Sequence, residues 1–176
     1  MSIKYLVDLC KELNHFKYTY LVDGKQVPKD KVPKLEDYCT MTLHTIKKYH
    51  IGLCWDITNY GYDILTKEGY TAETYFIEQE DGRDKKKNWC HTFTVVYIDD
   101  VVVLFEPTYN PMLGIHVYTS LTDLIDDFIH KSVADEKYAY TIYRYNCVGK
   151  DNSVAYDDFI KRVKEENRII LRQEEQ

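Results

Sequence analysis

The sequence predicts an α+β fold in which an antiparallel sheet packs against helices, as one domain spanning residues 1–176. Segments with helical spacing of apolar residues stand towards both ends of the chain, and runs rich in β-branched and aromatic residues occupy the middle. The two clearest runs are separated by only two residues, which favours an antiparallel hairpin. A length of 176 residues, 44% of them apolar, is sufficient for one hydrophobic core.

Helices are expected in three segments of the first half, where apolar residues recur three or four positions apart: 3–14, 33–48 and 54–69. Pro33 suits the first turn of the second segment, and Gly69 is a typical stop for the third. Asp23 and Gly24 predict a tight turn that joins two short extended runs, 18–22 and 25–27.

Strands are expected in four segments after residue 70: 71–77, 91–98, 101–105 and 138–145. Asp99 and Asp100 join the middle pair, and the third segment is apolar throughout, so it should be covered on both faces. Residues 78–88 contain no apolar anchor and predict a polar loop. Helical spacing recurs in two later segments, 121–129 and about 153–171.

Composition and charge argue against several classes of function. A net charge of −6 and a pI of about 5.5 disfavour a nucleic-acid partner. No apolar run approaches the ~20 residues that span a bilayer, so no membrane partner is expected. Charge at Lys4 and Asp8 interrupts the start in a way unlike a signal peptide. We therefore expect a cytoplasmic protein, and a secretion signal outside this sequence stays compatible with these observations.

The five cysteines are an odd number without a CxxC pair, which argues against a disulfide framework and a structural zinc site. Cys39, His44 and His50 come nearest to a set of metal ligands, but their spacing lets no single helix face hold all three. Neither a metal nor a cofactor is therefore expected.

Three residues in a fixed order carry the strongest indication of chemistry. Cys54 stands where a helix should begin, His91 opens a strand, and Glu106 closes the next strand. A thiol, a base that takes its proton and a third group that orients the base are the parts of a nucleophilic triad. A helix N-terminus and a nearby imidazolium both favour the thiolate of a cysteine, which makes Cys54 the candidate nucleophile.

The turn between the two strands decides whether His91 can meet Glu106. If only Asp99 and Asp100 form the turn, the pairing places Phe93 opposite Glu106. His91 is two residues from Phe93, so it shares the same face of the sheet. Diagonal neighbours of this kind are ~7–8 Å apart, within reach of side chains. A turn one residue longer or shorter would put the two side chains on opposite faces.

Together these pieces resemble the transglutaminase-like superfamily of cysteine enzymes and its protease-like relatives. In that family the cysteine begins a helix after a Gly-x-Cys stretch, the histidine opens the next core strand, and an acid ends the following strand before Pro-Thr. The corresponding stretches here are Gly52-Leu53-Cys54-Trp55, His91-Thr92-Phe93 and Glu106-Pro107-Thr108. The resemblance covers about residues 50–110 and implies a papain/transglutaminase-like core with the nucleophile at a helix N-terminus. The chain departs from the family by carrying glutamate where aspartate is usual.

The resemblance implies cysteine-dependent acyl chemistry on amide substrates, without a cofactor. Cys54 would attack the carbonyl, His91 would take and return the proton, and Glu106 would orient His91. Hydrolysis would make the protein a peptidase or deamidase, and transfer to an amine would make it an acyl transferase. A protein or peptide substrate is expected in either case.

Four neighbours of the triad are candidates for supporting roles. Trp55 and Trp89 each adjoin a triad residue and could line a substrate cleft. Tyr49 and His50 lie upstream of Cys54, where a side chain could complete an oxyanion hole with the backbone N–H of Cys54. A second interpretation keeps the fold without turnover, since the glutamate substitution and the 17 tyrosines suit a protein- or glycan-binding module.

Overall fold

The computed structural model describes residues 2–22, 25–27, 38–80, 89–132, 139–145, 152–165 and 168–173. The helices are α1 (Ile3–Asn14), α2 (Leu43–Tyr49), α3 (Cys54–Lys67), α4 (Leu121–Ser132) and α5 (Tyr156–Glu165), with a short 3-10 helix η4 (Asn110–Met112). The strands are β1 (Leu21–Val22), β2 (Lys25–Gln26), β3 (Thr71–Glu80), β4 (Trp89–Ile98), β5 (Val101–Glu106), β6 (Gly114–Tyr118), β7 (Ala139–Tyr145) and β8 (Arg168–Gln173).

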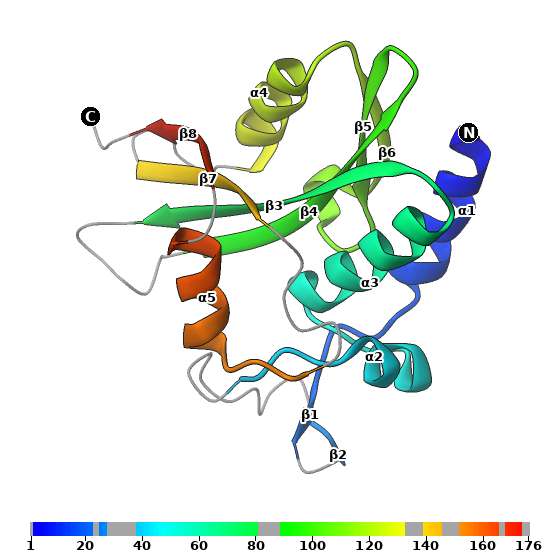
Figure 1. The fold of residues 1–176 in the computed structure, drawn as a ribbon, viewed down its shortest axis with the longest axis vertical. Helices are drawn as coiled ribbons and strands as arrows, with labels where there is room; N and C mark the ends of the chain where they lie inside the picture. Colours follow the sequence, from blue (N-terminus) through cyan, green and yellow to red (C-terminus); the bar gives the residue numbers. More distant parts are fainter. Residues whose placement is uncertain are drawn as a thin grey trace.

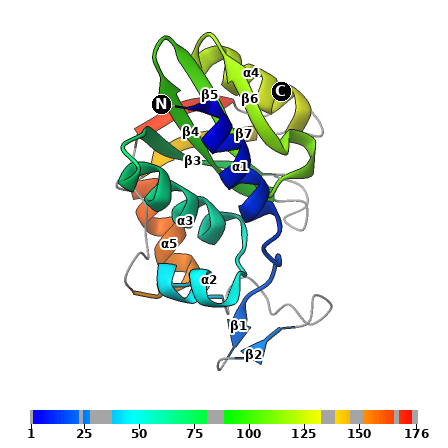
Figure 2. The same cartoon turned by 90° about the vertical axis from the view of Figure 1, so that its right-hand side faces the viewer.

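A six-stranded sheet in the order β6-β5-β4-β3-β7-β8 forms the centre of the fold, and all of its neighbouring strands are antiparallel. Helix α4 covers one face of this sheet, and α1, α3 and α5 cover the other (Figure 1). The β1–β2 hairpin projects beyond α2 at the end of the molecule remote from α4 (Figure 2). The expected α+β class, with an antiparallel sheet packed against helices, is confirmed.

The strand β5 shows how the two faces of the sheet are filled. Leu104 packs towards α4, in a cluster that includes Phe128. Phe105 packs on the opposite face with α1 and α3. Leu104 and Phe105 are fully buried, which confirms that this apolar strand is covered on both sides. On the α4 face, Phe93 stacks on Phe128 with ring centroids 4.4 Å apart.

The hairpin of β4 and β5 has the predicted register. Ile98 pairs with Val101, so the turn consists of Asp99 and Asp100 alone. Asp99 has a φ of 48°, in the left-handed region that aspartate enters more readily than most residues. The predicted turn is therefore confirmed, and with it the face on which each side chain of the two strands lies.

The helix expected over 33–48 is wrong over residues 38–42 and confirmed from Leu43 onwards. Residues 38–42 are extended and only α2 is helical, whereas the expected start at Pro33 lies outside the described residues. The N–H of Thr40 donates to the carbonyl of Val154 at 2.7 Å, so this segment bonds to a distant part of the chain instead of forming helical bonds. Tertiary pairing overrides local helix propensity here.

Three further expectations change at the sheet. The helix expected to reach about Leu171 ends with α5, and β8 follows it and pairs with β7. The polar loop expected from Glu78 begins later, because β3 continues to Glu80 between β4 and β7; residues 81–88 lie outside the described residues. Strand β6 was not expected at all. In the part of the chain that the structure describes, no helix has the length and apolar character needed to cross a bilayer.

Candidate active site

Cys54 is the first residue of α3, as the sequence predicts. The chain enters this helix through Gly52, which lies tightly against the first turn. A methyl group at this position would stand 2.8 Å from Cγ1 of Ile57 and 2.9 Å from Cβ of Asp56, so only glycine fits without a shift. The glycine therefore allows the loop before Cys54 to fold back onto the helix that Cys54 begins.

A buried carboxylate fixes the same helix end. Asp56 is 0% exposed, and its oxygens accept hydrogen bonds from the N–H of Leu53 at 2.9 Å and the N–H of Met41 at 2.8 Å. The hydroxyl of Tyr38 donates a third bond to it. Burial raises the pKa of Asp56 to about 6, although these three donors favour its charged form. Asp56 thus holds the residue that precedes Cys54, and it acts on the site as a positioning residue.

The β4–β5 hairpin brings His91 and Glu106 together. Nε2 of His91 lies 2.7 Å from Oε2 of Glu106, and the residues are 4% and 0% exposed. The other carboxylate oxygen, Oε1, accepts from the N–H of Thr108 at 2.8 Å, from its hydroxyl at 2.9 Å and from the N–H of Tyr109 at 2.9 Å. The length of glutamate lets one carboxylate bind His91 and the loop after β5 at the same time.

The ring of His91 also lies near the nucleophile candidate. The Cys54 side chain is close enough to the ring to raise the pKa of His91, and Nδ1 is the ring nitrogen that the bond to Glu106 does not use. Burial opposes a charge on His91, but the carboxylate of Glu106 and the nearby Cys54 outweigh it and raise the pKa of His91. His91 therefore has the carboxylate on one side and Cys54 in its neighbourhood, and its raised pKa favours the imidazolium form at neutral pH.

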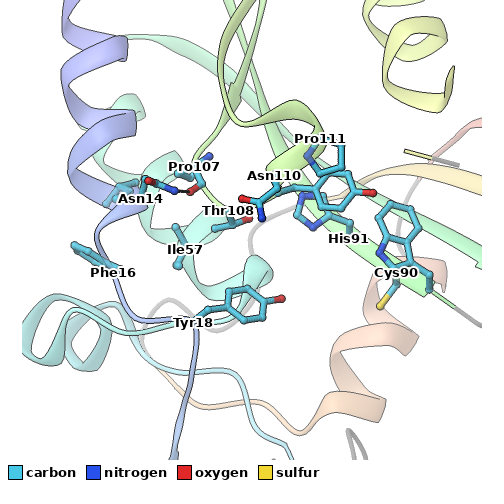
Figure 3. Close-up of a pocket in the computed structure, with 13 residues that line it drawn as sticks. Asn14, Phe16, Tyr18, Ile57, Cys90, His91, Pro107, Thr108, Asn110 and Pro111 are labelled. Atoms are coloured by element: carbon cyan, nitrogen blue, oxygen red, sulfur yellow. Dashed lines mark hydrogen bonds between the residues drawn. The ribbon is translucent and has the colours of Figure 1, made fainter. Parts of the chain in front are cut away.

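A cleft of about 510 Å³ opens beside the triad (Figure 3). Its walls come from the end of α1 and the segment after it, the first turn of α3, the start of β4 and residues 107–111. Asn14 donates to the carbonyl of Pro107 at 2.9 Å and so ties α1 to the loop that Glu106 holds. None of the described residues that line this cleft is Asp, Glu, Lys or Arg.

A second cleft of about 420 Å³ lies between β3, the start of β4 and α5. It shares Trp89 and Cys90 with the first cleft, and it carries charged side chains, among them Asp157 and the ion pair of Lys164 with Glu78 at 2.8 Å. The first cleft, which has His91 but no Asp, Glu, Lys or Arg among its described lining residues, therefore adjoins the charged cleft at the strand that carries His91.

The two tryptophans have different places. Trp89 lines both clefts, and its ring stacks on His91 with centroids 6.1 Å apart, so it stands where the sequence placed it. Trp55 is only 3% exposed and packs between Tyr38 and Phe159, in the hydrophobic core. The interpretation of Trp55 as a cleft residue is therefore replaced by a packing role.

Tyr49 and His50 do not form part of the site. His50 ends α2 in the left-handed region and stacks on Phe16 with ring centroids 4.9 Å apart. Tyr49 is 45% exposed, and the ammonium of Lys48 lies 5.0 Å from its ring centroid. Neither residue is among those that line the cleft beside His91, so the structure gives neither a place as oxyanion donor there.

The sequence reasoning missed two residues that contact the start of α3. Asp56 had a signal, because an acidic residue in the first turn of a helix often caps its N-terminus. Tyr18 had none: its hydroxyl lies near Cys54 although the two residues belong to separate parts of the chain. Among the described residues, no group of three or more His, Cys, Asp or Glu could hold a metal ion.

The chain matches no protein-family model and no curated protein at a significant level. The chemistry of the site is therefore inferred from its own geometry.

Proposed function

We propose that the protein is a cysteine-dependent enzyme that acts on amides, with Cys54 as nucleophile, His91 as proton carrier and Glu106 as orienting acid. One observation carries the proposal: the buried contact of 2.7 Å between Nε2 of His91 and Oε2 of Glu106. The same imidazole has Cys54, at the start of α3, as its second partner. A nucleophile, a base and an orienting acid in contact form the arrangement that acyl transfer through a thiol requires.

The reactive state is an ion pair. Because the pKa of His91 is raised, the imidazole is protonated at neutral pH, and Cys54 reacts as the thiolate beside it. The thiolate of Cys54 adds to the carbonyl carbon, and the electron pair of the C=O bond moves to oxygen. As this pair returns, the C–N bond breaks and His91 gives its proton to the leaving amine. A thioester on Cys54 remains.

The second half of the reaction restores the enzyme. Neutral His91 takes a proton from water or from an incoming amine, which attacks the thioester and releases Cys54 as thiolate. Water gives hydrolysis, as in a peptidase or deamidase, and an amine gives acyl transfer. Glu106 keeps the ring orientation fixed throughout, because it is buried and also bonded to the loop at Thr108.

The clefts support a protein or peptide substrate. The cleft beside His91, which has no Asp, Glu, Lys or Arg among its described lining residues, suits the neutral, partly apolar acyl part of an amide. The charged cleft beyond Trp89 and Cys90 suits a segment with charged side chains. A peptide that crosses the thiol could occupy both, with its reacting carbonyl between them.

The order of elements supports a papain/transglutaminase-like core. Helix α3 begins with the nucleophile, β4 carries the histidine and β5 ends with the acid, in the chain order of that family. The glutamate departs from the usual aspartate, and its second set of bonds to Thr108 and Tyr109 gives a reason for the longer side chain.

One observation favours a binding module that keeps this fold without turnover. Cys54 is only 2% exposed and His91 only 4% exposed, so the reacting groups are nearly closed to solvent. A binding protein could keep the same buried contacts for stability alone. The reactivity of the thiol distinguishes the two functions.

The proposal predicts that Cys54 reacts fastest of the cysteines at acid pH. Limiting iodoacetamide at pH 5–6 should label Cys54 ahead of the exposed Cys39. Iodoacetamide reacts with thiolates only, and the imidazolium of His91 stabilises the thiolate of Cys54. A matched variant, His91→Gln, should remove this advantage. Mass spectrometry of tryptic peptides measures both rates. A Cys54 that labels more slowly than Cys39 at every pH between 5 and 9 would support the binding module.

A further inference from the structure

We propose that Tyr18 is a catalytic residue of this site: its hydroxyl and the backbone N–H of Cys54 together form the oxyanion hole. The inference rests on the proposed function and names the donor that the triad itself does not supply. Acyl transfer places negative charge on the former carbonyl oxygen, and two aligned donors usually stabilise it. The N–H of Cys54 at the start of α3 is one such donor.

The backbone places Tyr18 beside the loop that leads to Cys54. The N–H of Lys17 donates to the carbonyl of His50 at 2.9 Å, and the N–H of Gly52 donates to the carbonyl of Lys17 at 3.1 Å. These bonds form a parallel bridge between Lys17 and Ile51. The residue after Lys17 is therefore fixed next to the start of α3, although it follows α1 in the chain.

The side chain of Tyr18 crosses the cleft beside His91, with its hydroxyl directed below His91 (Figure 3). The residue is 53% exposed overall, yet its hydroxyl end is enclosed and lies close enough to Cys54 to interact with it electrostatically. Burial of the hydroxyl end and the neighbouring charge of Cys54 raise the pKa of Tyr18, so the phenol stays protonated. A neutral phenol is a hydrogen-bond donor at every pH at which the enzyme would work.

The two donors define where the substrate oxygen binds. The backbone N–H of Cys54 and the hydroxyl of Tyr18 can both donate, and Tyr18 lines the cleft that opens beside His91. A carbonyl oxygen between the two groups would accept from both as the thiolate attacks. The ring of Tyr18 has room to align with this oxygen because half of the residue faces solvent.

Two reagents that attack the same sulfur separate this role from general reactivity. Acylation of Cys54 by p-nitrophenyl acetate passes through an oxyanion, and alkylation by iodoacetamide does not. Tyr18→Phe keeps the ring and removes only the hydroxyl. We expect it to slow acylation by about 10²–10³-fold, as the loss of one oxyanion donor does, and to change the alkylation rate by no more than about twofold. Tyr49→Phe, at an exposed tyrosine outside the cleft, should leave both rates unchanged.

Each other outcome overturns the inference in a recognisable way. Equal acylation rates for Tyr18→Phe and the parent protein would remove Tyr18 from the hole and leave the proposed function intact. Faster acylation of the variant would mean that Tyr18 only obstructs the thiol. Parallel losses of acylation, alkylation and melting temperature would mean a structural role. A parent protein whose Cys54 is not acylated at all would overturn the proposed function, and the inference with it.

Discussion

Cys54 lies between two regions that the chain builds in different ways. On one side the β4–β5 hairpin carries His91 and Glu106, and a turn of two residues sets their positions. On the other side the segment after α1 carries Tyr18, and the bonds of Lys17 to a distant loop set its position. Proximity along the chain fixes the first region, and tertiary packing fixes the second. The difference indicates which half of a site can be predicted from alternation alone.

The two regions also differ in how firmly they are held. Glu106 is 0% exposed and has partners at both carboxylate oxygens, so the hairpin region is preorganised before substrate binds. Tyr18 is 53% exposed and only its hydroxyl end is enclosed, so this region can adjust. Substrate should therefore reach Cys54 from the side of Tyr18, with little change at His91.

The largest effect should come from breaking the hairpin region at its acid. Glu106→Gln keeps the shape of the side chain but removes the charge that favours the imidazolium of His91. We expect turnover, or acylation of Cys54, to fall by about 10⁴-fold, as in other triads whose acid becomes an amide. This loss should exceed that of Tyr18→Phe, which removes one donor and no charge. Single-turnover acylation rates of the two variants measure the difference directly.

Glu106→Asp serves as the matched control for the same position. It keeps the charge but shortens the reach, so the carboxylate can no longer hold both His91 and the N–H of Tyr109. An intermediate loss is expected. If Glu106→Gln kept more than a tenth of the parent rate, Glu106 would not orient His91. The hairpin region would then contribute no more to the acylation rate than the region of Tyr18.

The next largest effect should come from the loop that joins the two regions. In Gly52→Ala the new methyl group would stand 2.8 Å from Cγ1 of Ile57, and the N–H that bonds to Lys17 would be displaced. Overpacking of this kind costs about 1–3 kcal/mol of unfolding free energy. Urea unfolding measures the loss, and the ratio of acylation to alkylation should fall as in Tyr18→Phe. Gly69→Asn is the comparison: nothing lies near its new Cβ, so its cost is the strain of the left-handed backbone alone, and it should destabilise less than Gly52→Ala. Equal stability of Gly52→Ala and the parent protein would contradict the close contact of Gly52 with the first turn of α3.

Much of the hairpin region could be predicted because period-two alternation and a two-residue turn leave little freedom. Once Ile98 pairs with Val101, the faces of His91 and Glu106 follow from counting. The start of α3 at Cys54 was also predictable, since Gly52 interrupts one helical pattern just before the next begins. These features depend on residues close together in the chain.

The wrong predictions concern segments whose partners are far away. Residues 38–42 have helical spacing, but their backbone bonds to Val154 and extends. The end of the chain has a helical pattern as far as about Leu171, yet residues 168–173 form β8 and pair with the edge of β7. For the same reason Trp55, expected in the cleft, lies in the core, and Tyr18, given no role from the sequence, lies in the cleft. Burial depends on tertiary packing, which the spacing of residues in the sequence does not reveal. Tertiary contacts decided each of these cases.

The smallest expected effect is a pH dependence of the unfolding free energy, which should come from the hairpin region and not from the region of Tyr18. His91 has a raised pKa in the folded protein and an ordinary one, about 6.5, when unfolded. Its contribution to stability is therefore fully present below about pH 6.5 and is lost as the pH rises through the folded value. One proton limits the slope to about 1.4 kcal/mol per pH unit. Urea unfolding between pH 6 and 9.5 should show this decline relative to His91→Gln.

Two controls assign that decline to the hairpin region. His44→Gln, at an exposed position of α2, should keep the pH dependence of the parent protein. Tyr18→Phe should keep it as well, because the raised pKa of Tyr18 leaves the phenol neutral throughout this range. If the difference in unfolding free energy between the parent protein and His91→Gln stayed constant from pH 6.5 to 9.5, the folded site would take up no net proton. His91 would then be neutral or would hold a proton taken from Cys54, and it would not titrate as a single group with a raised pKa.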